Sequence, residues 1–215
     1  MPEAVKSRIE GRVGVLTLTE EARGNALTVR LVEAARAVHE EFIARGVRVA
    51  VLEAEGAAFC SGRDKEVVRV PGVPPAGAVF IEEIDNSPLV WIAAVDGPVV
   101  GAGIHLVSAC FHVVAGPGAE FRVPELLDGI YPRPVSAELA RVIGPRQTAA
   151  LLITGGPLSG EAAVAAGLVG EVVGAGEATE RALERARTLD GLGVELLATA
   201  REGWRTRFGT APSGV

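Results

Sequence analysis

Aromatic residues, cysteine and methionine are scarce in this sequence of 215 residues. Only 4% of the residues are Phe, Trp or Tyr, whereas 48% are hydrophobic. The core is therefore predicted to be aliphatic, built from Val, Ala and Leu. A chain of this length and hydrophobic content is normally one domain and can bury a substantial core.

Basic residues are also few. Lys and Arg number 21 against 27 Asp and Glu, which gives a net charge of -6. This balance argues against a general nucleic-acid binder, because neutralising phosphates requires a basic face. The two cysteines, Cys60 and Cys110, lie in apolar, glycine-rich surroundings typical of free buried thiols. Together with the lack of an apolar signal segment in residues 1–6, they predict a cytoplasmic protein.

Residues 98–118 carry no Asp, Glu, Lys or Arg, so they are long and apolar enough to suggest a membrane span. The run also contains His105, Ser108, His112 and several glycines, and periodic segments typical of globular proteins flank it. We therefore predict a buried strand, turn and helix here, and no membrane association.

Hydrophobic periodicity predicts alternating strands and helices up to about residue 134. Short apolar or β-branched runs predict strands at 12–18, 47–53, 89–95 and 111–115. Helices are predicted at 27–44, with Thr28 as the N-cap, at 79–85, and from the turn at 97–103 to about residue 109. Strands that alternate with helices favour an α/β fold, a parallel sheet covered on both faces.

Beyond residue 134 the pattern is mostly helical. Helices are predicted at 136–143, 146–154, 159–166 and 177–205, with one short strand at 169–173. This pattern divides the chain into a core domain, residues 1–173, and a short helical C-terminal region, residues 174–215.

Two glycine turns, residues 59–64 and 97–103, follow the second and third predicted strands. In a parallel α/β sheet, ligands collect at the carboxyl ends of the strands. A glycine turn that opens a helix offers free N–H donors and a favourable dipole for negative charge. Two such donors could hold a thioester oxygen as an enolate forms, and Glu125, in a third loop, could move the proton. The plain alternative is that the glycines only make turns.

Seven short motifs carry a family resemblance. They are residues 25–27, 59–64, 92–98, 101–103, 124–129, 152–155 and 165–169. In this order and approximate spacing they resemble the crotonase superfamily, the enoyl-CoA hydratases and isomerases, over about residues 13–173. The resemblance implies a crotonase-like ββα-superhelix core with a shortened helical C-terminal region. It also implies acyl-CoA thioester substrates, a homotrimer or hexamer, and no cofactor or metal beyond the coenzyme A of the substrate.

The resemblance also implies site residues. The backbone N–H groups of Ser61 and Ala102 match the oxyanion hole, and the two acid–base carboxylates match His105 and Glu125. Other positions that match the ligand contacts are Arg23, Asn25, Ala26, Cys60, Gly62, Asp64, Gly101 and Gly103. For Arg23 a plain surface position, and for Asp64 a role in capping backbone donors, are the alternatives. Cys60 lacks an obvious base and is not predicted to be a nucleophile.

His105 stands where the resemblance predicts a carboxylate. Adding water to a conjugated thioester works best with two carboxylates, whereas a double-bond shift or enolate formation needs one base. We therefore expect an acyl-CoA-processing enzyme with a single base, Glu125, and isomerase-like or other enolate chemistry. His105 is either a second acid–base group, because imidazole titrates near neutrality, or a helix histidine satisfied by a loop carbonyl.

Other interpretations are weaker. A short C-terminal region, where the family carries a longer one, leaves open a non-catalytic acyl-CoA-binding or accessory protein. Ser108 could be the nucleophile of a Clp-like peptidase, but that reaction needs a histidine where this chain has Glu125. His112 is expected in the core or an interface and His39 on a helix surface. Asp128 and Tyr131 are expected to be a loop aspartate and a half-buried tyrosine.

Overall fold

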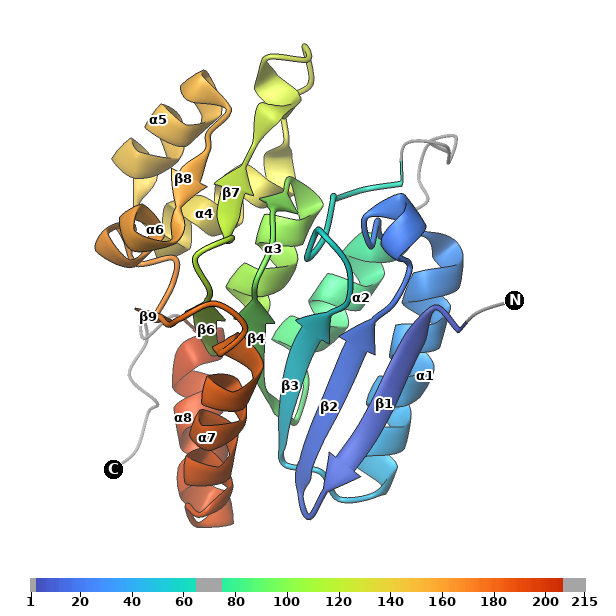
Figure 1. Cartoon of the computed structure of the whole chain (residues 1–215). Coiled ribbons are helices and arrows are strands. Elements are labelled where there is room, and N and C mark those ends of the chain that lie inside the picture. Colours follow the sequence, from blue (N-terminus) through green and yellow to red (C-terminus); the bar gives the residue numbers. More distant parts are fainter. Residues whose placement is uncertain (1–2, 65–74, 207–215) are drawn as a thin grey trace.

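The computed structural model describes residues 3–64 and 75–206 of the chain. Its centre is a six-stranded sheet in the order β1-β2-β3-β4-β6-β9 (Figure 1). The strands are β1 (Val5–Glu10), β2 (Val13–Leu18), β3 (Val49–Ala54), β4 (Val90–Val95), β6 (His112–Ala115) and β9 (Glu171–Val172). Within this sheet β2, β3, β4, β6 and β9 run parallel, which confirms the predicted α/β class, and β1 is antiparallel to β2.

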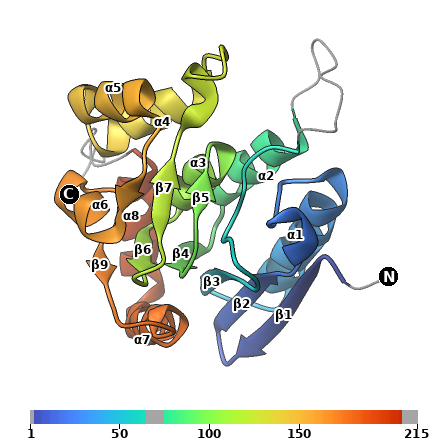
Figure 2. The same cartoon turned by 45° about the horizontal axis from the view of Figure 1, so that its top comes forward.

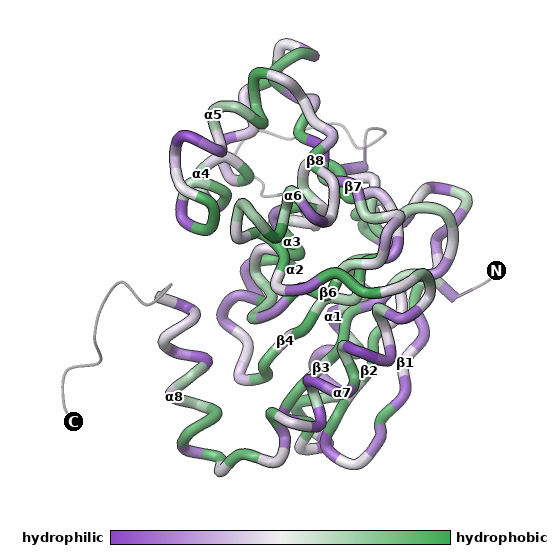
Figure 3. Tube along the Cα trace, turned by 60° about the vertical axis from the view of Figure 1, so that its left-hand side comes forward, coloured by the Kyte–Doolittle hydropathy of each residue, from purple (hydrophilic) through white to green (hydrophobic). Residues whose placement is uncertain are grey.

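Helices cover both faces of this sheet. The helices α1 (Val29–Ala44), α2 (Ala76–Asp85) and α3 (Ala102–Ala109) lie behind it in Figure 1, and α7 (Ala178–Asp190) lies in front. Alternate residues of each strand point to opposite faces, so Leu16 and Leu52 pack with one set of helices and Val15 and Val51 with α7. The first helix of the C-terminal region therefore covers the second face of the same sheet. In Figure 3 the hydrophobic segments gather along the central strands.

A second, three-stranded sheet, β5-β7-β8, stands above the carboxyl ends of the parallel strands (Figure 2). Its strands are β5 (Val99–Val100), β7 (Glu120–Arg122) and β8 (Leu158–Ser159). Around it lie α4 (Arg133–Val142), α5 (Pro145–Thr154) and α6 (Gly160–Ala166). The 3-10 turn η2 (Pro124–Leu126) follows β7 and contacts α5, whereas η1 (Glu21–Arg23) lies in the loop before α1. Strands of two or three residues are too short to show an alternating pattern, so the sequence did not predict this sheet.

Side-chain hydrogen bonds mark the N-terminus of α1 and the C-terminus of α7. Thr28 caps α1 as predicted, because its hydroxyl accepts a hydrogen bond from the N–H of Leu31 at 3.0 Å. The single helix predicted over 177–205 is wrong, since α7 and α8 (Val194–Arg205) are separate helices. Arg48 binds the carbonyls of Asp190 and Leu192 at 3.0 and 2.8 Å and so terminates α7.

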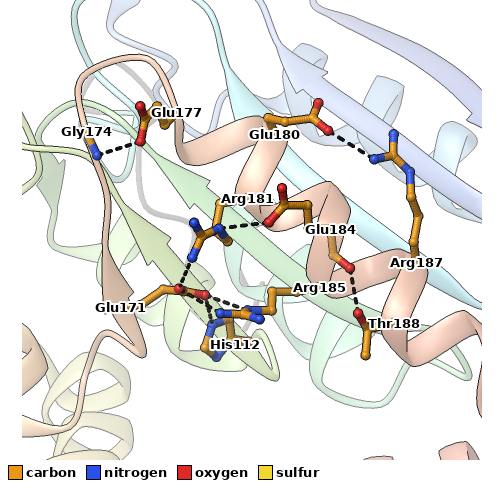
Figure 4. A network of polar contacts seen from close by, with 10 residues as sticks. All are labelled: His112, Glu171, Gly174, Glu177, Glu180, Arg181, Glu184, Arg185, Arg187 and Thr188. Atoms are coloured by element: carbon orange, nitrogen blue, oxygen red, sulfur yellow. Dashed lines mark hydrogen bonds and ion pairs between the residues drawn. The ribbon is translucent and has the colours of Figure 1, made fainter.

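A cluster of charges fastens α7 to the edge of the sheet (Figure 4). Glu171 of β9 is bound by Arg185 at 2.7 Å, by Arg181 at 3.0 Å and by His112 of β6 at 3.3 Å. These hydrogen bonds, above all the one from Arg185, lower the pKa of Glu171 to about 2. His112 thus lies partly buried in this cluster, between β6 and β9.

His39 is in the interior, so its predicted surface position is wrong. Its side chain is 6% exposed, and Nε2 lies 2.9 Å from the hydroxyl oxygen of Ser87. The sequence misled because charged residues surround His39 along α1, while the helix turns this one position toward Trp91.

The uncharged run 98–118 folds as β5, α3 and β6, with most of its residues buried, as predicted. Among the described residues, no helix has the length and apolar character needed to cross a membrane.

Candidate active site

The two glycine turns lie at the carboxyl ends of β3 and β4 and contact each other directly. The N–H groups of Phe59 and Cys60 bind the carbonyl of Pro98 at 3.1 and 3.3 Å. In return, the N–H of Val100 binds the carbonyl of Cys60 at 2.9 Å. The sequence placed each turn correctly, and the structure shows that hydrogen bonds join them.

Two glycines allow this close approach. Gly62 has φ of +95°, and a Cβ atom on it would lie 2.7 Å from the carbonyl oxygen of Val100 and 3.6 Å from the nitrogen of Ala102. A Cβ atom on Gly103 would lie 2.9 Å from the carbonyl oxygen of Cys60. Only glycine fits at both positions, and the first turn of α3 therefore rests on the turn 59–64.

The loop before α1 is a third part of the site. The N–H of Leu27 binds the carbonyl of Gly62 at 2.8 Å, which joins this loop to the turn 59–64. Asn25 is fully buried with φ of +52°, and its amide binds the carbonyls of Glu55 and Ala58, each at 2.9 Å. The side chains of Asn25 and Ala26 are buried, and that of Asn25 holds the loop, while their predicted contact with a ligand stays a prediction.

Arg23 and Asp64 bind each other. The guanidinium of Arg23 lies 2.9 Å from the carboxylate of Asp64, which is 6% exposed. Arg23 was predicted to face the phosphates of a ligand and Asp64 to lie near it. The pair compensates both charges and closes the junction between the loop before α1 and the turn 59–64.

The predicted oxyanion hole needs a correction at Ser61. The N–H of Ser61 donates to the carbonyl of Gly24 at 2.8 Å, so it holds the loops together and does not face a ligand. The N–H of Arg63 takes part in no backbone hydrogen bond among the described residues. The N–H of Ala102 begins α3 and has no partner within its helix. The N–H groups of Arg63 and Ala102 therefore both lack a backbone partner among the described residues, and they belong to two segments that lie against each other.

Glu125 lies beside the start of α3. Its carboxylate rests against Gly101, whose φ of +52° and missing side chain leave the necessary space. The carbonyl of Glu125 accepts a hydrogen bond from the N–H of Ile130 at 2.7 Å, which closes the loop that carries it. Gly101 in turn binds the carbonyl of Arg122 through its N–H at 2.9 Å. The carboxylate of the predicted base thus lies against the residue that precedes Ala102.

His105 lies one helical turn after Ala102 and is half-buried. Its backbone N–H binds the carbonyl of Gly101 at 3.4 Å. The two predicted acid–base positions, Glu125 and His105, are therefore both at the first turn of α3, although they are twenty residues apart in the sequence.

Cys60 is fully buried beneath this site. The N–H of Gly62 hydrogen-bonds its sulfur, but burial dominates and raises the pKa of the thiol to about 12. A thiol with such a pKa is inert at neutral pH. Its side chain packs against Gly103 and does not reach a ligand, so it supports the turn. Both cysteines are free, as expected.

The sequence reasoning missed a group of exposed apolar side chains that follows Glu125. Leu127 is 64% and Tyr131 is 56% exposed, more than the half-buried position expected for the tyrosine. The other members of the group are Leu126, Ile130 and, from α5, Ile153. The apolar residues at 126, 127, 130 and 131 were a visible signal in the sequence. No cluster of metal-binding side chains occurs within residues 3–64 and 75–206.

Known proteins resemble the chain along nearly its whole length. The sequence profile described as Enoyl-CoA hydratase/isomerase matches residues 8–209. A probable enoyl-CoA hydratase of Rhizobium meliloti is 31% identical over 206 residues, which are 93% of this chain and 80% of the relative. A probable enoyl-CoA hydratase of Bacillus subtilis is 31% identical over 86% of this chain and 74% of its own length.

Solved structures share the fold. The enoyl-CoA hydratase of Bacillus anthracis superimposes with a TM-score of 0.86 at 25% identity, covering 97% of this chain and 84% of that one. An enoyl-CoA hydratase/isomerase of Cupriavidus metallidurans does so with a TM-score of 0.86 at 27% identity, covering 97% and 82%. The expected crotonase fold is confirmed, and the chain belongs to the enoyl-CoA hydratase/isomerase family.

Proposed function

We propose that the protein processes acyl-CoA thioesters through an enolate, with Glu125 as the single base that removes and returns a proton. The observation that carries this proposal is the position of the Glu125 carboxylate against Gly101, beside the N–H of Ala102. A base must lie within hydrogen-bond reach of the carbon acid while the thioester oxygen is held. The backbone at Gly101 and Ala102 supports both conditions, because the first leaves space for the base and the second offers the N–H donor.

The oxyanion hole consists of the N–H groups of Ala102 and Arg63. A Cβ atom on Gly62, the residue before Arg63, would lie 2.7 Å from the carbonyl oxygen of Val100 and 3.6 Å from the nitrogen of Ala102, so the two donors belong to adjoining segments. The start of α3 adds the positive end of a helix dipole. Two donors fixed by the fold stabilise the developing negative charge without reorganisation, which is often the largest contribution to catalysis.

Enolate chemistry, such as moving a double bond, is favoured over hydration. The reason is His105, which stands where the resemblance predicts the second carboxylate. Hydration requires one group to activate water and another to deliver a proton, whereas isomerisation requires only that Glu125 return its proton at another carbon. If His105 serves as the second group, the enzyme becomes a hydratase, as its relatives are named.

The substrate class follows from those names, since an enoyl-CoA hydratase acts on a thioester of coenzyme A. The proposed proton transfers need no further cofactor. We also propose a homotrimer or hexamer, and the exposed Leu127, Ile130 and Tyr131 support it, because large apolar side chains grouped at a surface mark contact sites.

The decisive experiment replaces Glu125 by Gln, which keeps the shape and removes the base. Turnover across a panel of 2-enoyl-CoA and 3-enoyl-CoA thioesters should fall roughly a hundredfold or more, while calorimetry shows retained binding. Glu120→Gln is the matched control, because Glu120 pairs with Arg122 within the same strand, β7, and this change should leave the rate unchanged. An unchanged rate in Glu125→Gln would exclude this residue as the base. Binding without turnover in the native protein would instead favour a non-catalytic acyl-CoA binder.

His105 is tested separately. In His105→Glu, hydration of a short 2-enoyl-CoA should appear or rise, because a second carboxylate is restored beside the water. In His105→Gln, isomerisation should persist. Loss of an already high native hydratase rate in His105→Gln would instead identify the histidine as the second acid–base group.

A further inference from the structure

Arg63 is an exposed cation at the site, and it forms no ion pair with the described residues. Several other arginines of the protein do form ion pairs. Arg23 pairs with Asp64, and Arg36 and Arg185 pair with Glu83 and Glu171. In a protein with a net charge of -6, an uncompensated guanidinium is a feature to explain.

The position of Arg63 is fixed by its backbone. It pairs with Leu27 in a parallel bridge, and the carbonyl of Gly62 accepts the N–H of Leu27 at 2.8 Å. Gly62 itself packs against Val100 and Ala102. The backbone of Arg63 is therefore held between the loop before α1 and the start of α3, while the residue itself is exposed.

We infer that the guanidinium of Arg63 binds a carboxylate at the far end of a short acyl group, so that the ligands of this site are thioesters of dicarboxylic acids. This inference rests on the proposed function, in which the N–H of Arg63 faces the thioester oxygen. The planar guanidinium donates two parallel hydrogen bonds to a carboxylate, which a lysine cannot do.

Reach selects the acyl end of the ligand. An arginine side chain extends roughly 7 Å from its Cα, given bonds of about 1.5 Å. This reach matches the distance from a thioester held at the N–H of the same residue to a carboxylate three or four carbons further along the acyl group. The nearest phosphate of coenzyme A is separated from the thioester sulfur by about thirteen bonds, roughly 15 Å when extended. An extended coenzyme A therefore carries its phosphates beyond Arg63.

The charges at the site also favour a carboxylate on the acyl group as the partner of Arg63. A carboxylate on the acyl group enters a site that already holds the carboxylate of Glu125, and two like charges repel there unless a cation lies between them. Asp64 does not compensate Arg63, because Asp64 is buried and bound to Arg23. Arg63 is thus available to offset an incoming negative charge.

The test compares two thioesters of equal chain length, glutaryl-CoA and pentanoyl-CoA, by calorimetry. The native protein should bind glutaryl-CoA about tenfold more tightly, the size expected for a charge-assisted pair that stays partly hydrated. In Arg63→Gln this preference should vanish, with pentanoyl-CoA binding unchanged. Arg63→Lys should recover part of it. Arg146→Gln, at an exposed arginine on α5 that also forms no ion pair with the described residues, should behave as the native protein.

A glutaryl preference that survives in Arg63→Gln would overturn the inference, as would equal native affinities for the two ligands. Arg63→Gln could also weaken the binding of both CoA thioesters equally, and leave the binding of glutaryl-pantetheine and pentanoyl-pantetheine, which lack the phosphates, unchanged. That result would identify a phosphate of coenzyme A as the partner of Arg63 and would also overturn the inference. The calorimetry measures binding and does not depend on turnover. A protein without catalytic activity would therefore contradict the proposed enolate chemistry, but the affinities for the two thioesters could still be compared. Failure of the native protein to bind either thioester would contradict both.

Discussion

The carboxylate of Glu125 occupies the space that a side chain on Gly101 would take. Gly101 also has φ of +52°, a conformation that residues with a Cβ rarely adopt. The placement of the base therefore depends on a missing side chain at the residue before α3. The same residue precedes the N–H of Ala102, so one glycine sets both the proton acceptor and an oxyanion donor.

Gly101→Ala should therefore impair catalysis more than stability. The new methyl group would collide with the carboxylate and displace it from the start of α3. We expect turnover to fall at least about a hundredfold, because small misplacements of a catalytic group are costly. The free energy of unfolding should fall by roughly 1–3 kcal/mol from backbone strain. Steady-state kinetics and urea unfolding measure the two effects.

Gly46→Ala is the matched control for that strain. Gly46 has φ of +73°, but no heavy atom lies within 4 Å of the added methyl group. It should lose stability to a similar degree and keep its full rate. A parallel loss of rate in both variants would show that the collision with Glu125 has no special effect.

The sequence was sufficient for the parts of the fold that follow periodicity. The parallel strands, α1 with its Thr28 cap and the two glycine turns are all local patterns, and the structure has them where they were predicted. It was insufficient for β1, whose residues are mostly exposed and so lack alternation, and for the break at residues 191–193.

The site shows the same limit. Glu125 and the start of α3 could be named from motifs, because motifs encode local chemistry. Which N–H groups face a ligand could not, since that depends on partners distant in sequence. Ser61 was predicted as a donor, yet it binds the carbonyl of Gly24, a contact between loops that no local pattern records. Arg23 was likewise predicted to face a ligand, yet it binds Asp64, which lies 41 positions away in the sequence.

Glu171→Gln should weaken the attachment of α7 in a pH-dependent way. The pKa of Glu171 is lowered to about 2 by Arg185, His112 and Arg181, against a value near 4.5 in the unfolded chain. A lowered carboxylate pKa stabilises the fold above the unfolded value and loses that effect as pH falls through the folded value. We expect the native protein to exceed the variant by roughly 1–3 kcal/mol at pH 7, because the cluster is only partly buried.

Urea unfolding between pH 7 and pH 2 follows this difference. It should be constant down to about pH 5 and shrink between 4.5 and 2, as Glu171 is protonated in the native protein. Glu180→Gln removes an exposed ion pair with Arg187 on the same helix and should have almost no effect. A pH-independent difference for Glu171→Gln would show that lost packing, and not charge, explains it.

The proton of His39 is assigned by its neighbour Ser87. The hydroxyl oxygen accepts hydrogen bonds from the N–H of Leu89 at 3.0 Å and from the indole N–H of Trp91 at 3.2 Å. Both lone pairs are then used, so the hydroxyl must donate its own hydrogen to Nε2 of His39. His39 is therefore neutral, with its proton on Nδ1.

Acid should destabilise the protein through this histidine. Burial lowers the pKa of His39, against smaller opposing effects of Glu83 and Glu40, while Arg36 lowers it further. The unfolded chain therefore takes up the proton first, and stability should fall as pH drops below about 6.5 toward the folded pKa. His39→Gln keeps an acceptor for Ser87 and cannot be protonated, so its stability should be flat over this range. Urea unfolding at pH 5 to 8, followed by Trp fluorescence, decides the matter, and an identical slope in the variant would contradict the assignment.

Replacing the exposed apolar side chains that follow Glu125 should disrupt self-association. Leu127 and Ile130 are 64% and 48% exposed, and burying them between subunits would remove apolar area from water. In sedimentation velocity at micromolar concentration, the native protein should behave as a trimer or hexamer and the double variant Leu127→Ser with Ile130→Ser as a smaller species. Val194 and Leu196 on α8, which are 70% and 58% exposed, provide the control pair, whose change to Ser should leave the size unchanged. A monomeric native protein would leave this apolar group without a partner subunit, and the proposed oligomer would be wrong.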